Sequence, residues 1–249
     1  MYTGASFQKA TAVGRISVQE SPSNSTEDAA ENKKVAVFDL DGTLTFKDTY
    51  VQFLLFCFRK YPTRLLRGVN LVVYLVLYKS GLRSNHWLKA RYLKTVAAGI
   101  PPDKFDRLCE EFCQLTIEDN IKPKAMIEIN RLRQAGYVLV LATASFDFYV
   151  SRLFELLKMD HLLCTASAVD GAGCITGEID GKNCIGSEKA RRVAALVEIS
   201  DWSGVDSAYS DDRVDMPLFE MAGTAFVVDP DPSTESLANQ RNFQVLNWR

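Results

Sequence analysis

The chain has 249 residues, 47% of them hydrophobic, which suits one domain or one domain with an insertion. Its 29 lysines and arginines nearly balance 31 aspartates and glutamates, and this formal charge of -2 lacks the basic excess that is typical of nucleic-acid-binding proteins. We therefore expect no nucleic-acid partner. The six cysteines form no CxxC pair and the chain has only two histidines, so no zinc site is indicated and reduced, structural thiols are expected.

The first 32 residues differ in composition from the rest of the chain. They contain no unbroken apolar run of the kind that a secretory signal needs, and they end in a stretch rich in serine, asparagine, acidic residues and lysine. Such a stretch has little to bury, so residues 1–32 are predicted to form a disordered tail. We accordingly expect a cytoplasmic protein.

Beyond the tail, short apolar runs alternate with amphipathic segments of helical length. Apolar strands separated by helices predict an α/β fold with a parallel sheet covered on both faces, and such folds bind ligands at the carboxyl ends of their strands. The expected strands are Val35–Phe38, Tyr137–Thr143, His161–Thr165, Val205–Ser210 and Thr224–Asp229, and the expected helices are Pro123–Gln134, Phe146–Lys158, Ser187–Val197 and Asp215–Ala222.

Residues 48–117 interrupt this alternation because they contain no clear strand. We predict that they form an all-helical cap, inserted into a Rossmann-like core that comprises residues 33–47 and 118–249. Short pieces with Asp-Gly turns in Ser167–Gly181 also suggest a hairpin. The cap helices are expected at Tyr50–Lys60, Leu65–Lys79, Asn85–Val96 and Asp103–Leu115.

Acidic side chains follow two of the predicted strands. Asp39 and Asp41 end the first strand, and Gly42 permits a turn of the backbone there, so that both carboxylates can face one ligand. Asp211 and Asp215 stand at the end of the fourth strand and the start of a helix. For the first pair, two solvated acids beside a turn are the alternative.

A hydroxyl group and a cation are predicted at the same edge of the sheet. The second strand ends at Thr143, and Lys189 lies in the first turn of a predicted helix, where the helix dipole disfavours a cation. Lys189 could therefore serve an anionic ligand, and a surface lysine is the alternative. Together, these residues bring two carboxylate clusters, a hydroxyl group and a lysine to one edge.

This ordered set resembles the four motifs of the haloacid dehalogenase superfamily of phosphatases. The DxDGT of the first motif corresponds to residues 39–43, and the hydroxyl residue of the second corresponds to Thr143. The lysine of the third motif corresponds to Lys189, and the acidic pair of the fourth to Asp211 and Asp215. The resemblance covers roughly residues 34–229 and implies a Rossmann-like core with an inserted cap.

The resemblance also implies a Mg²⁺-dependent phosphomonoester hydrolase that acts through an aspartyl-phosphate. Asp39 would be the nucleophile, and Asp41 the general acid and then the general base. Thr143 and Lys189 would bind the phosphoryl oxygens. Magnesium prefers hard oxygen ligands, and those implied here are Asp39, the backbone carbonyl of Asp41, Asp211 and, in support, Asp215.

The position of the cap resembles the phosphoserine-phosphatase-like branch of the superfamily. Several stretches resemble its bacterial members, some of which act on phosphatidylglycerophosphate and others on phosphoserine or similar small phosphomonoesters. In phosphoserine phosphatases an acidic residue binds the substrate amine and a cap arginine binds the substrate carboxylate. Asp48 and Arg91 fall near those places, although Asp48 departs from the usual glutamate and could instead be a helix N-cap or a hinge.

The segment Leu71–Tyr78 is apolar all round and has basic residues on both sides. It is too short to span a membrane but could lie at an anionic membrane surface, and a buried cap helix is the alternative. We favour a phosphatidylglycerophosphate-like lipid substrate with peripheral contact at the inner face of the membrane. A phosphatase of a small soluble metabolite and a non-catalytic membrane-associated protein on a phosphatase scaffold are the other hypotheses.

Overall fold

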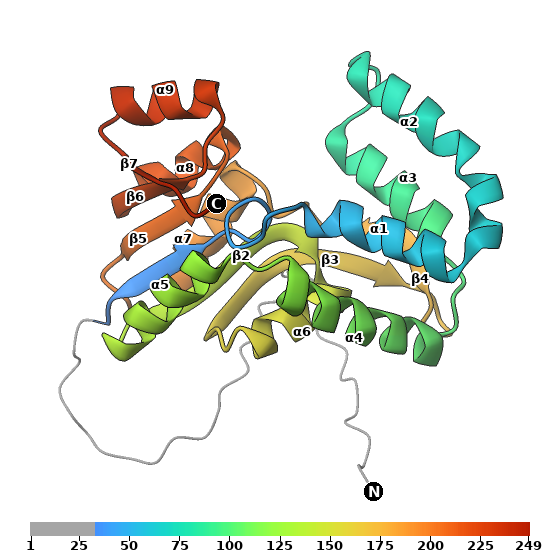
Figure 1. Cartoon of the computed structure of the whole chain (residues 1–249), viewed down its shortest axis with the longest axis horizontal. Helices are drawn as coiled ribbons and strands as arrows, with labels where there is room; N and C mark the ends of the chain where they lie inside the picture. The colour runs from blue at the N-terminus through green and yellow to red at the C-terminus, as the bar shows by residue number, and fades with distance from the viewer. Residues whose placement is uncertain (1–32) are drawn as a thin grey trace, which may run out of the picture.

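A twisted sheet of seven strands forms the centre of the described part of the chain (Figure 1). The computed structural model describes residues 33–249, so the predicted tail at residues 1–32 lies outside the described residues. The strand order is β4-β3-β2-β1-β5-β6-β7, and all neighbours are parallel except β3 and β4. The strands are β1 (Val35–Phe38), β2 (Val138–Phe146), β3 (His161–Val169), β4 (Ile175–Asp180), β5 (Val205–Ser210), β6 (Ala222–Val228) and β7 (Gln244–Leu246).

Strand β1 is fully buried because it supplies apolar side chains to both faces of the sheet. Ala36 and Phe38 join one core, with helices α5 (Pro123–Gln134) and α6 (Asp147–Leu156). The alternate residues of β1 join a second core on the other face. Its helices are α7 (Ser187–Ile199), α8 (Met216–Glu220) and α9 (Pro232–Gln240). The predicted α/β fold with a mainly parallel, doubly covered sheet is therefore confirmed.

Several boundaries differ from the sequence prediction. Strand β2 runs on to Phe146, past the expected end at Thr143, and β3 is also longer than expected. The helix expected at Asp215–Ala222 is present as the shorter α8 (Met216–Glu220), and Asp215 itself ends the preceding 3-10 turn, η2 (Arg213–Asp215). The predicted hairpin is confirmed as the antiparallel pair β3–β4.

Helical segments fill the interval between β1 and α5. A 3-10 turn ends before Gly68, which precedes α2, so the single helix expected from Leu65 is divided there. The elements are α1 (Thr49–Lys60), η1 (Pro62–Arg67), α2 (Val69–Lys79), α3 (Asn85–Ala97) and α4 (Pro102–Asp119).

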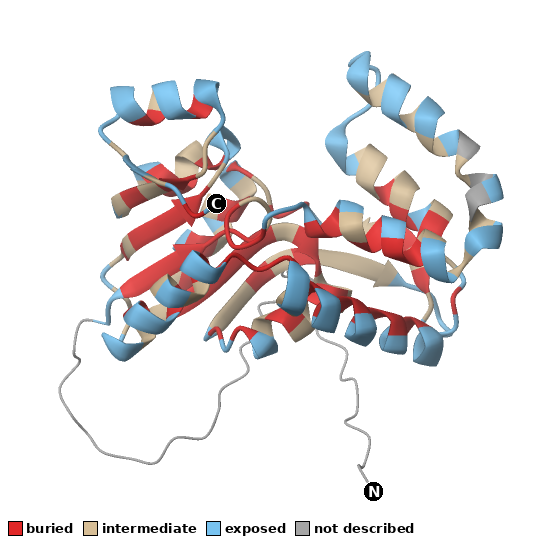
Figure 2. Ribbon diagram, in the orientation of Figure 1, coloured by how far each residue is buried: buried red, intermediate tan, exposed pale blue. Residues whose placement is uncertain are grey.

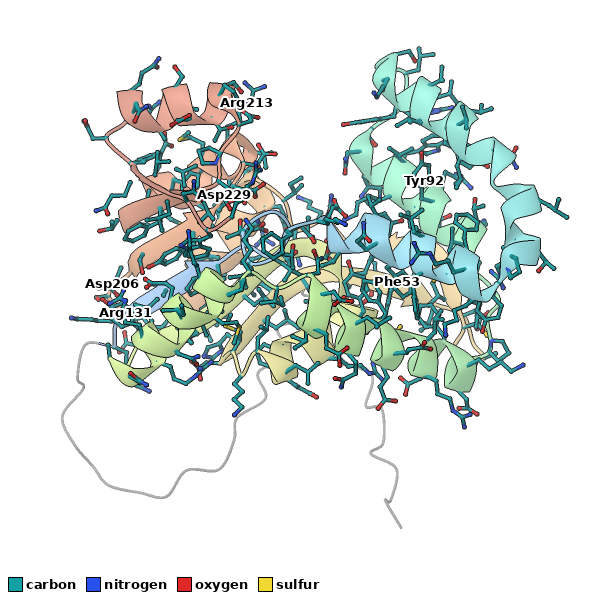
Figure 3. The ribbon with its side chains drawn as sticks, in the orientation of Figure 1. Phe53, Tyr92, Arg131, Asp206, Arg213 and Asp229 are labelled. Carbon is teal, nitrogen blue, oxygen red and sulfur yellow. The ribbon has the colours of Figure 1, made fainter. Side chains whose placement is uncertain are left out.

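The cap helices differ in how much they bury. Helix α4 places an apolar stripe against the core, and the Cys113 thiol lies 3.2 Å from the carbonyl oxygen of Tyr149 on α6. Phe53 of α1, labelled in Figure 3, packs its ring against Tyr149 as well. Helix α2 has no buried residue among those described, and Figure 2 shows it as an exposed outer layer. The alternative of a buried cap helix is therefore wrong.

The β3–β4 hairpin lies against the cap helix α3. Gly177 of β4 has a φ of +88°, and a Cβ atom there would lie 2.3 Å from the Cα atom of Lys94 on α3. Only glycine allows this close approach of strand and helix. The hairpin thus supports the helix that lines the site described next.

Candidate active site

The first acidic pair lies where three neighbouring strands end. The amide N–H of Asp39 donates to the carbonyl oxygen of Tyr209 (2.9 Å), which continues the pairing of β1 with β5. Gly42 then turns with a φ of +81°, and a Cβ atom on it would lie 2.1 Å from Asp211 Oδ2. Thr43 Oγ1 lies 3.4 Å from Asp39 Oδ2 and 3.2 Å from Asp211 Oδ1. The loop therefore brings Asp39 and Asp211 to one point.

Lys189 enters this point from the first turn of α7. Its Nζ donates to Asp39 Oδ1 at 2.7 Å and to Asp215 Oδ2 at 2.5 Å, and its side chain is 2% exposed. Burial alone would lower the pKa of Lys189, but the charges of Asp39 and Asp215 outweigh it and raise that pKa. The side chain is a charged ammonium group between two carboxylates.

The site carries more negative charge than Lys189 balances. Burial raises the pKa of Asp39 against the opposing effect of Lys189, and neighbouring carboxylates add to the rise. Burial also raises the pKa of Asp211 to about 6. Among residues 33–249, Asp215 Oδ1 is buried without a hydrogen-bond partner. A divalent cation would relieve this repulsion.

The donor set fits Mg²⁺, although no three acidic, histidine or cysteine side chains of the described residues form a ready metal cluster. Magnesium commonly takes one or two carboxylates and completes its shell with waters and substrate phosphates. Asp39 and Asp211 are two such carboxylates, joined by Thr43. Asp215 Oδ2 accepts hydrogen bonds from Lys189 and Ser210, so Asp215 suits the supporting role at the metal site that the resemblance implied.

Asp41 is held from two sides at the base of the cap. The N–H of Thr49, the first residue of α1, donates to Asp41 Oδ1 (2.6 Å), and Ser145 Oγ donates to Asp41 Oδ2 (2.5 Å). Thr49 Oγ1 in turn lies 3.2 Å from Ser145 Oγ and 3.1 Å from the Tyr149 hydroxyl. Ser145 was not among the predicted site residues, although its place just after Thr143 at a strand end could have indicated it.

Thr143 is fully buried at this edge of the sheet. Its Oγ1 accepts from the N–H of Ser145 at 3.0 Å and so shapes the turn of the chain. The cavity is lined by Ala144 and Ser145, and Thr143 is not among its lining residues.

An open cavity of about 550 Å³ joins the acidic edge to the cap. Asp48 lines it and also caps α1, with Oδ1 accepting from Val51 N–H at 2.8 Å, and burial raises the pKa of Asp48. Arg91 does not line the cavity, because its guanidinium lies over the Trp87 ring at 5.8 Å. The cavity-facing side of α3 instead carries Asn85, Leu88, Lys89 and Tyr92.

Residues 36–220 match the family of haloacid dehalogenase-like hydrolases. The chain belongs to this family. The prediction of an enzyme of this superfamily is confirmed, and curated relatives that are named phosphatases support phosphatase activity.

Three curated proteins are similar in sequence to this chain. The "Inhibition of morphological differentiation protein" of Streptomyces azureus is 28% identical over 161 residues, which are 63% of this chain and 57% of that protein. A histidinol-phosphatase of Neisseria meningitidis is 24% identical over 87% of this chain and 100% of its own length. Phosphoserine phosphatase SerB1 of Mycobacterium tuberculosis is 34% identical over 46% of this chain, which spans only 37% of that protein.

Solved structures share the fold. A protein of unknown function from Bordetella pertussis Tohama I superposes with a TM-score of 0.78 and 24% identity, over 88% of this chain and 100% of that one. A phospho-aspartyl intermediate analogue of phosphoserine phosphatase gives a TM-score of 0.62 and 18% identity, over 88% and 95% of the two chains. At these identities the likeness supports the haloacid dehalogenase-like fold.

Lys89 is a cavity residue that the family motifs did not predict. Its Nζ donates to the carbonyl oxygen of Ala144 at 2.5 Å and lies 3.4 Å from Asn183 Oδ1. Burial lowers the pKa of Lys89 to about 8. The spacing of Asn85, Lys89 and Tyr92 along one helix face could have indicated it, whereas the match to an arginine position pointed to Arg91.

A buried ion pair supports the motif loop from behind. Lys122 Nζ lies 2.8 Å from Asp229 Oδ2, both side chains are 2% exposed, and the same Nζ donates to the carbonyl oxygen of Gly42. Nothing in the sequence around Lys122 indicated this role. The pair fixes the turn that presents Asp39 and Asp211.

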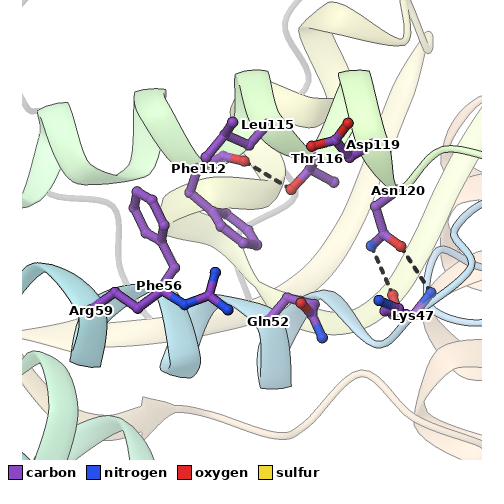
Figure 4. A pocket seen from close by; sticks show the side chains of 9 residues that line it. All are labelled: Lys47, Gln52, Phe56, Arg59, Phe112, Leu115, Thr116, Asp119 and Asn120. Carbon is purple, nitrogen blue, oxygen red and sulfur yellow. Dashed lines mark hydrogen bonds between the residues drawn. The ribbon is translucent and has the colours of Figure 1, made fainter.

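A second, smaller cavity of about 260 Å³ lies between α1 and α4 and is lined by none of the motif residues (Figure 4). At its edge, Lys47 N–H donates to Asn120 Oδ1 (2.9 Å) and Asn120 Nδ2 donates to the carbonyl oxygen of Lys47 (3.0 Å). These bonds tie together the two segments that connect the cap to the core.

Proposed function

We propose that this haloacid dehalogenase-like hydrolase cleaves phosphomonoesters with Mg²⁺ through an aspartyl-phosphate on Asp39. The observation that carries the proposal is the position of Asp39 between the Lys189 ammonium and Asp211, at the mouth of a cavity. A nucleophilic carboxylate beside a cation and a metal-binding carboxylate suits attack on a phosphate dianion. Curated relatives named as phosphatases support this chemistry.

The reaction takes two displacements. An Asp39 carboxylate oxygen forms a bond to phosphorus while the bond to the leaving oxygen breaks, and Asp41 gives that oxygen its proton. Asp41 then takes a proton from water as the water oxygen bonds to phosphorus, and the Asp39–phosphorus bond breaks to release phosphate. Lys189 neutralises a phosphoryl oxygen in both steps.

The surrounding residues prepare Asp39 and Asp41 for these steps. Mg²⁺, held by Asp39, the backbone carbonyl of Asp41 and Asp211 with Asp215 in support, would neutralise charge between nucleophile and phosphate. Thr49 and Ser145 fix the orientation of Asp41 toward the leaving group. Thr143 is proposed to bind the phosphoryl group, and its bond to Ser145 N–H orders the turn beside that group.

Asp211→Asn is expected to weaken Mg²⁺ binding while stabilising the metal-free protein. The folded pKa of Asp211 lies at about 6, above its unfolded value of 3.8, so the carboxyl group costs stability as the pH rises between these values. The metal-free variant should therefore gain up to about 3 kcal/mol of unfolding free energy at pH 7 and well under about 1 kcal/mol near pH 4.

Thermal unfolding with and without Mg²⁺ measures both effects. Mg²⁺ at 100 times its Kd would stabilise the wild type by about 2.7 kcal/mol, and the variant should lose most of this gain. Asp103→Asn, at an exposed acid in the first turn of α4, is the matched control. An equal Mg²⁺ shift in wild type and Asp211→Asn would contradict the assignment.

For the substrate, we favour a lipid phosphomonoester such as phosphatidylglycerophosphate. The open cavity and the exposed apolar helix α2 support an amphiphilic substrate. A small soluble phosphomonoester is the second candidate, supported by the relatives named phosphoserine phosphatase and histidinol-phosphatase. In that case Asp48, which lines the cavity, would contact the substrate, whereas Arg91 would require a rearrangement of α3 to do so.

Phosphate release with Mg²⁺ separates these substrates. We expect kcat/KM for phosphatidylglycerophosphate in detergent micelles to exceed that for phosphoserine and for histidinol phosphate. Preference for either soluble ester would reject the lipid substrate but keep the hydrolase chemistry. A folded protein that releases phosphate from none of a broad phosphomonoester panel would favour the non-catalytic scaffold instead.

A further inference from the structure

The outer face of α2 is an exposed apolar surface. Val72, Val73 and Val76 are 66%, 52% and 60% exposed on this helix, and Leu66 and Leu82 are exposed beside its two ends. Figure 2 shows the helix without buried segments at the edge of the molecule. Exposed apolar side chains gathered on one helix and beside its ends indicate a site of contact with a protein or a membrane. We refer to these five side chains as the α2 face.

The helix that carries the α2 face is fixed to the cap by its inner side. The Tyr92 hydroxyl donates to the carbonyl oxygen of Leu71 at 3.0 Å, and the rings of Tyr74 and Trp87 meet edge to face. Tyr92, labelled on α3 in Figure 3, also lines the active-site cavity. Tyr92 therefore links the wall of the cavity to α2.

The stretch of sequence that carries the α2 face is basic. No aspartate or glutamate occurs between Asp48 and Asp103, whereas this interval contains nine lysines and arginines. The remaining chain carries 20 basic and 31 acidic residues, and Glu111 and Glu178 from that part pair with Lys60 and Lys94 of the basic interval. Lys79 and Arg83, at the end of α2 and just beyond it, are both exposed. An apolar surface with cationic borders matches an anionic lipid surface.

We propose that the α2 face docks on an anionic lipid bilayer, with valines and leucines entering the interface and Lys79 and Arg83 among the headgroups. An 11-residue helix is about 16 Å long, roughly half the hydrocarbon thickness, so α2 would lie along the surface. No helix of the described residues is long and apolar enough to cross a membrane. A second copy fits less well, because a two-fold dimer would oppose cationic borders with no acidic residue in the interval to balance them.

This docking surface extends the proposed function, and its link to a lipid substrate rests on that function. Binding of the protein to vesicles can be measured without turnover. Vesicles of neutral phosphatidylcholine, with and without anionic phosphatidylglycerol, are sedimented with the full chain. Wild type should bind the anionic vesicles and bind neutral ones much more weakly. Val72→Ser with Val76→Ser should reduce partitioning roughly tenfold or more, since each valine would enter the interface.

Matched controls separate the α2 face from general hydrophobicity and charge. Ile127→Ser with Ile199→Ser removes two exposed apolar side chains elsewhere and should leave vesicle binding unchanged. Lys79→Gln with Arg83→Gln should weaken binding to anionic vesicles, whereas Lys158→Gln with Lys182→Gln should not. Hydrolysis of p-nitrophenyl phosphate should persist in the Val72 and Val76 variants, which separates failed docking from a failed hydrolase assignment.

Three results would overturn the proposal. Wild type could fail to bind anionic vesicles, or the Ile127 and Ile199 control could lose as much binding as the α2 variant. Sedimentation velocity could instead show a dimer that the changes at Val72 and Val76 dissociate, which would assign the face to a second copy of the chain.

Discussion

Asp39→Asn is expected to lower kcat by roughly 10⁴-fold or more on any phosphomonoester that the wild type hydrolyses. The amide cannot attack phosphorus, and Asp39 is the carboxylate of the first motif that accepts from the Lys189 ammonium. Asn has the same size as Asp, so the fold should persist. Phosphate release with Mg²⁺, together with thermal unfolding, measures the two effects separately.

Asp103→Asn is the control for this change, because it removes an exposed acid in the cap that touches no motif residue. Its kcat should match that of the wild type. If Asp39→Asn kept more than about a hundredth of the wild-type kcat while folded, a loss far smaller than expected for a nucleophile, another group would have to perform the attack.

Lys189→Met is expected to lose both activity and stability. Methionine fills a similar volume but leaves the buried carboxylates of Asp39 and Asp215 without their cation. Removing one partner of a buried ion pair costs about 3 to 5 kcal/mol of unfolding free energy. The loss of charge stabilisation at the phosphoryl group should reduce kcat by about 10²- to 10³-fold. Chemical unfolding and phosphate release measure these two losses.

A double variant distinguishes the structural from the catalytic role of this lysine. Lys189→Met with Asp215→Asn removes one of the two stranded charges, so much of the unfolding free energy should return. The kcat should remain low, because the cation is still absent. Recovery of kcat together with stability would show that Lys189 acts only by holding the fold.

The motif residues could be predicted because each one follows a recognisable strand or begins a recognisable helix, and because their side chains suit one phosphate site. The apolar run of β1 and the acids that follow it indicate a strand end, and parallel neighbours bring Asp39 and Asp211 to one edge. Lys189 was identified by its place in a helix first turn, and the structure puts it on Asp39. Helix α9 and strand β7 were missed, since the segment that forms them has few apolar residues and weak periodicity.

Other features depend on helix phase and tertiary packing. An all-apolar helix gives no preferred face, so the sequence left open whether α2 is buried. Its exposure follows from tertiary packing, in which α3 covers its inner side. The rotation of α3 decides that Lys89 and not Arg91 lines the cavity. A contact between segments far apart in the sequence, such as that of Lys122 with Gly42, carries no local signal.

The central claim is that Asp39 carries the phosphoryl group during turnover. Acid quenching of the Mg²⁺ reaction, followed by peptide mass mapping, tests this most directly, and Asp41→Asn is added because loss of the general base slows hydrolysis of the intermediate. We predict that the wild-type peptide containing Asp39 gains one phosphoryl group and that Asp39→Asn shows no phosphorylated peptide. With p-nitrophenyl phosphate, whose leaving group needs no proton, Asp41→Asn should accumulate more of the phosphorylated peptide than the wild type. A phosphoryl group on a different residue, or turnover with an unmodified Asp39 peptide in both proteins, would contradict the account.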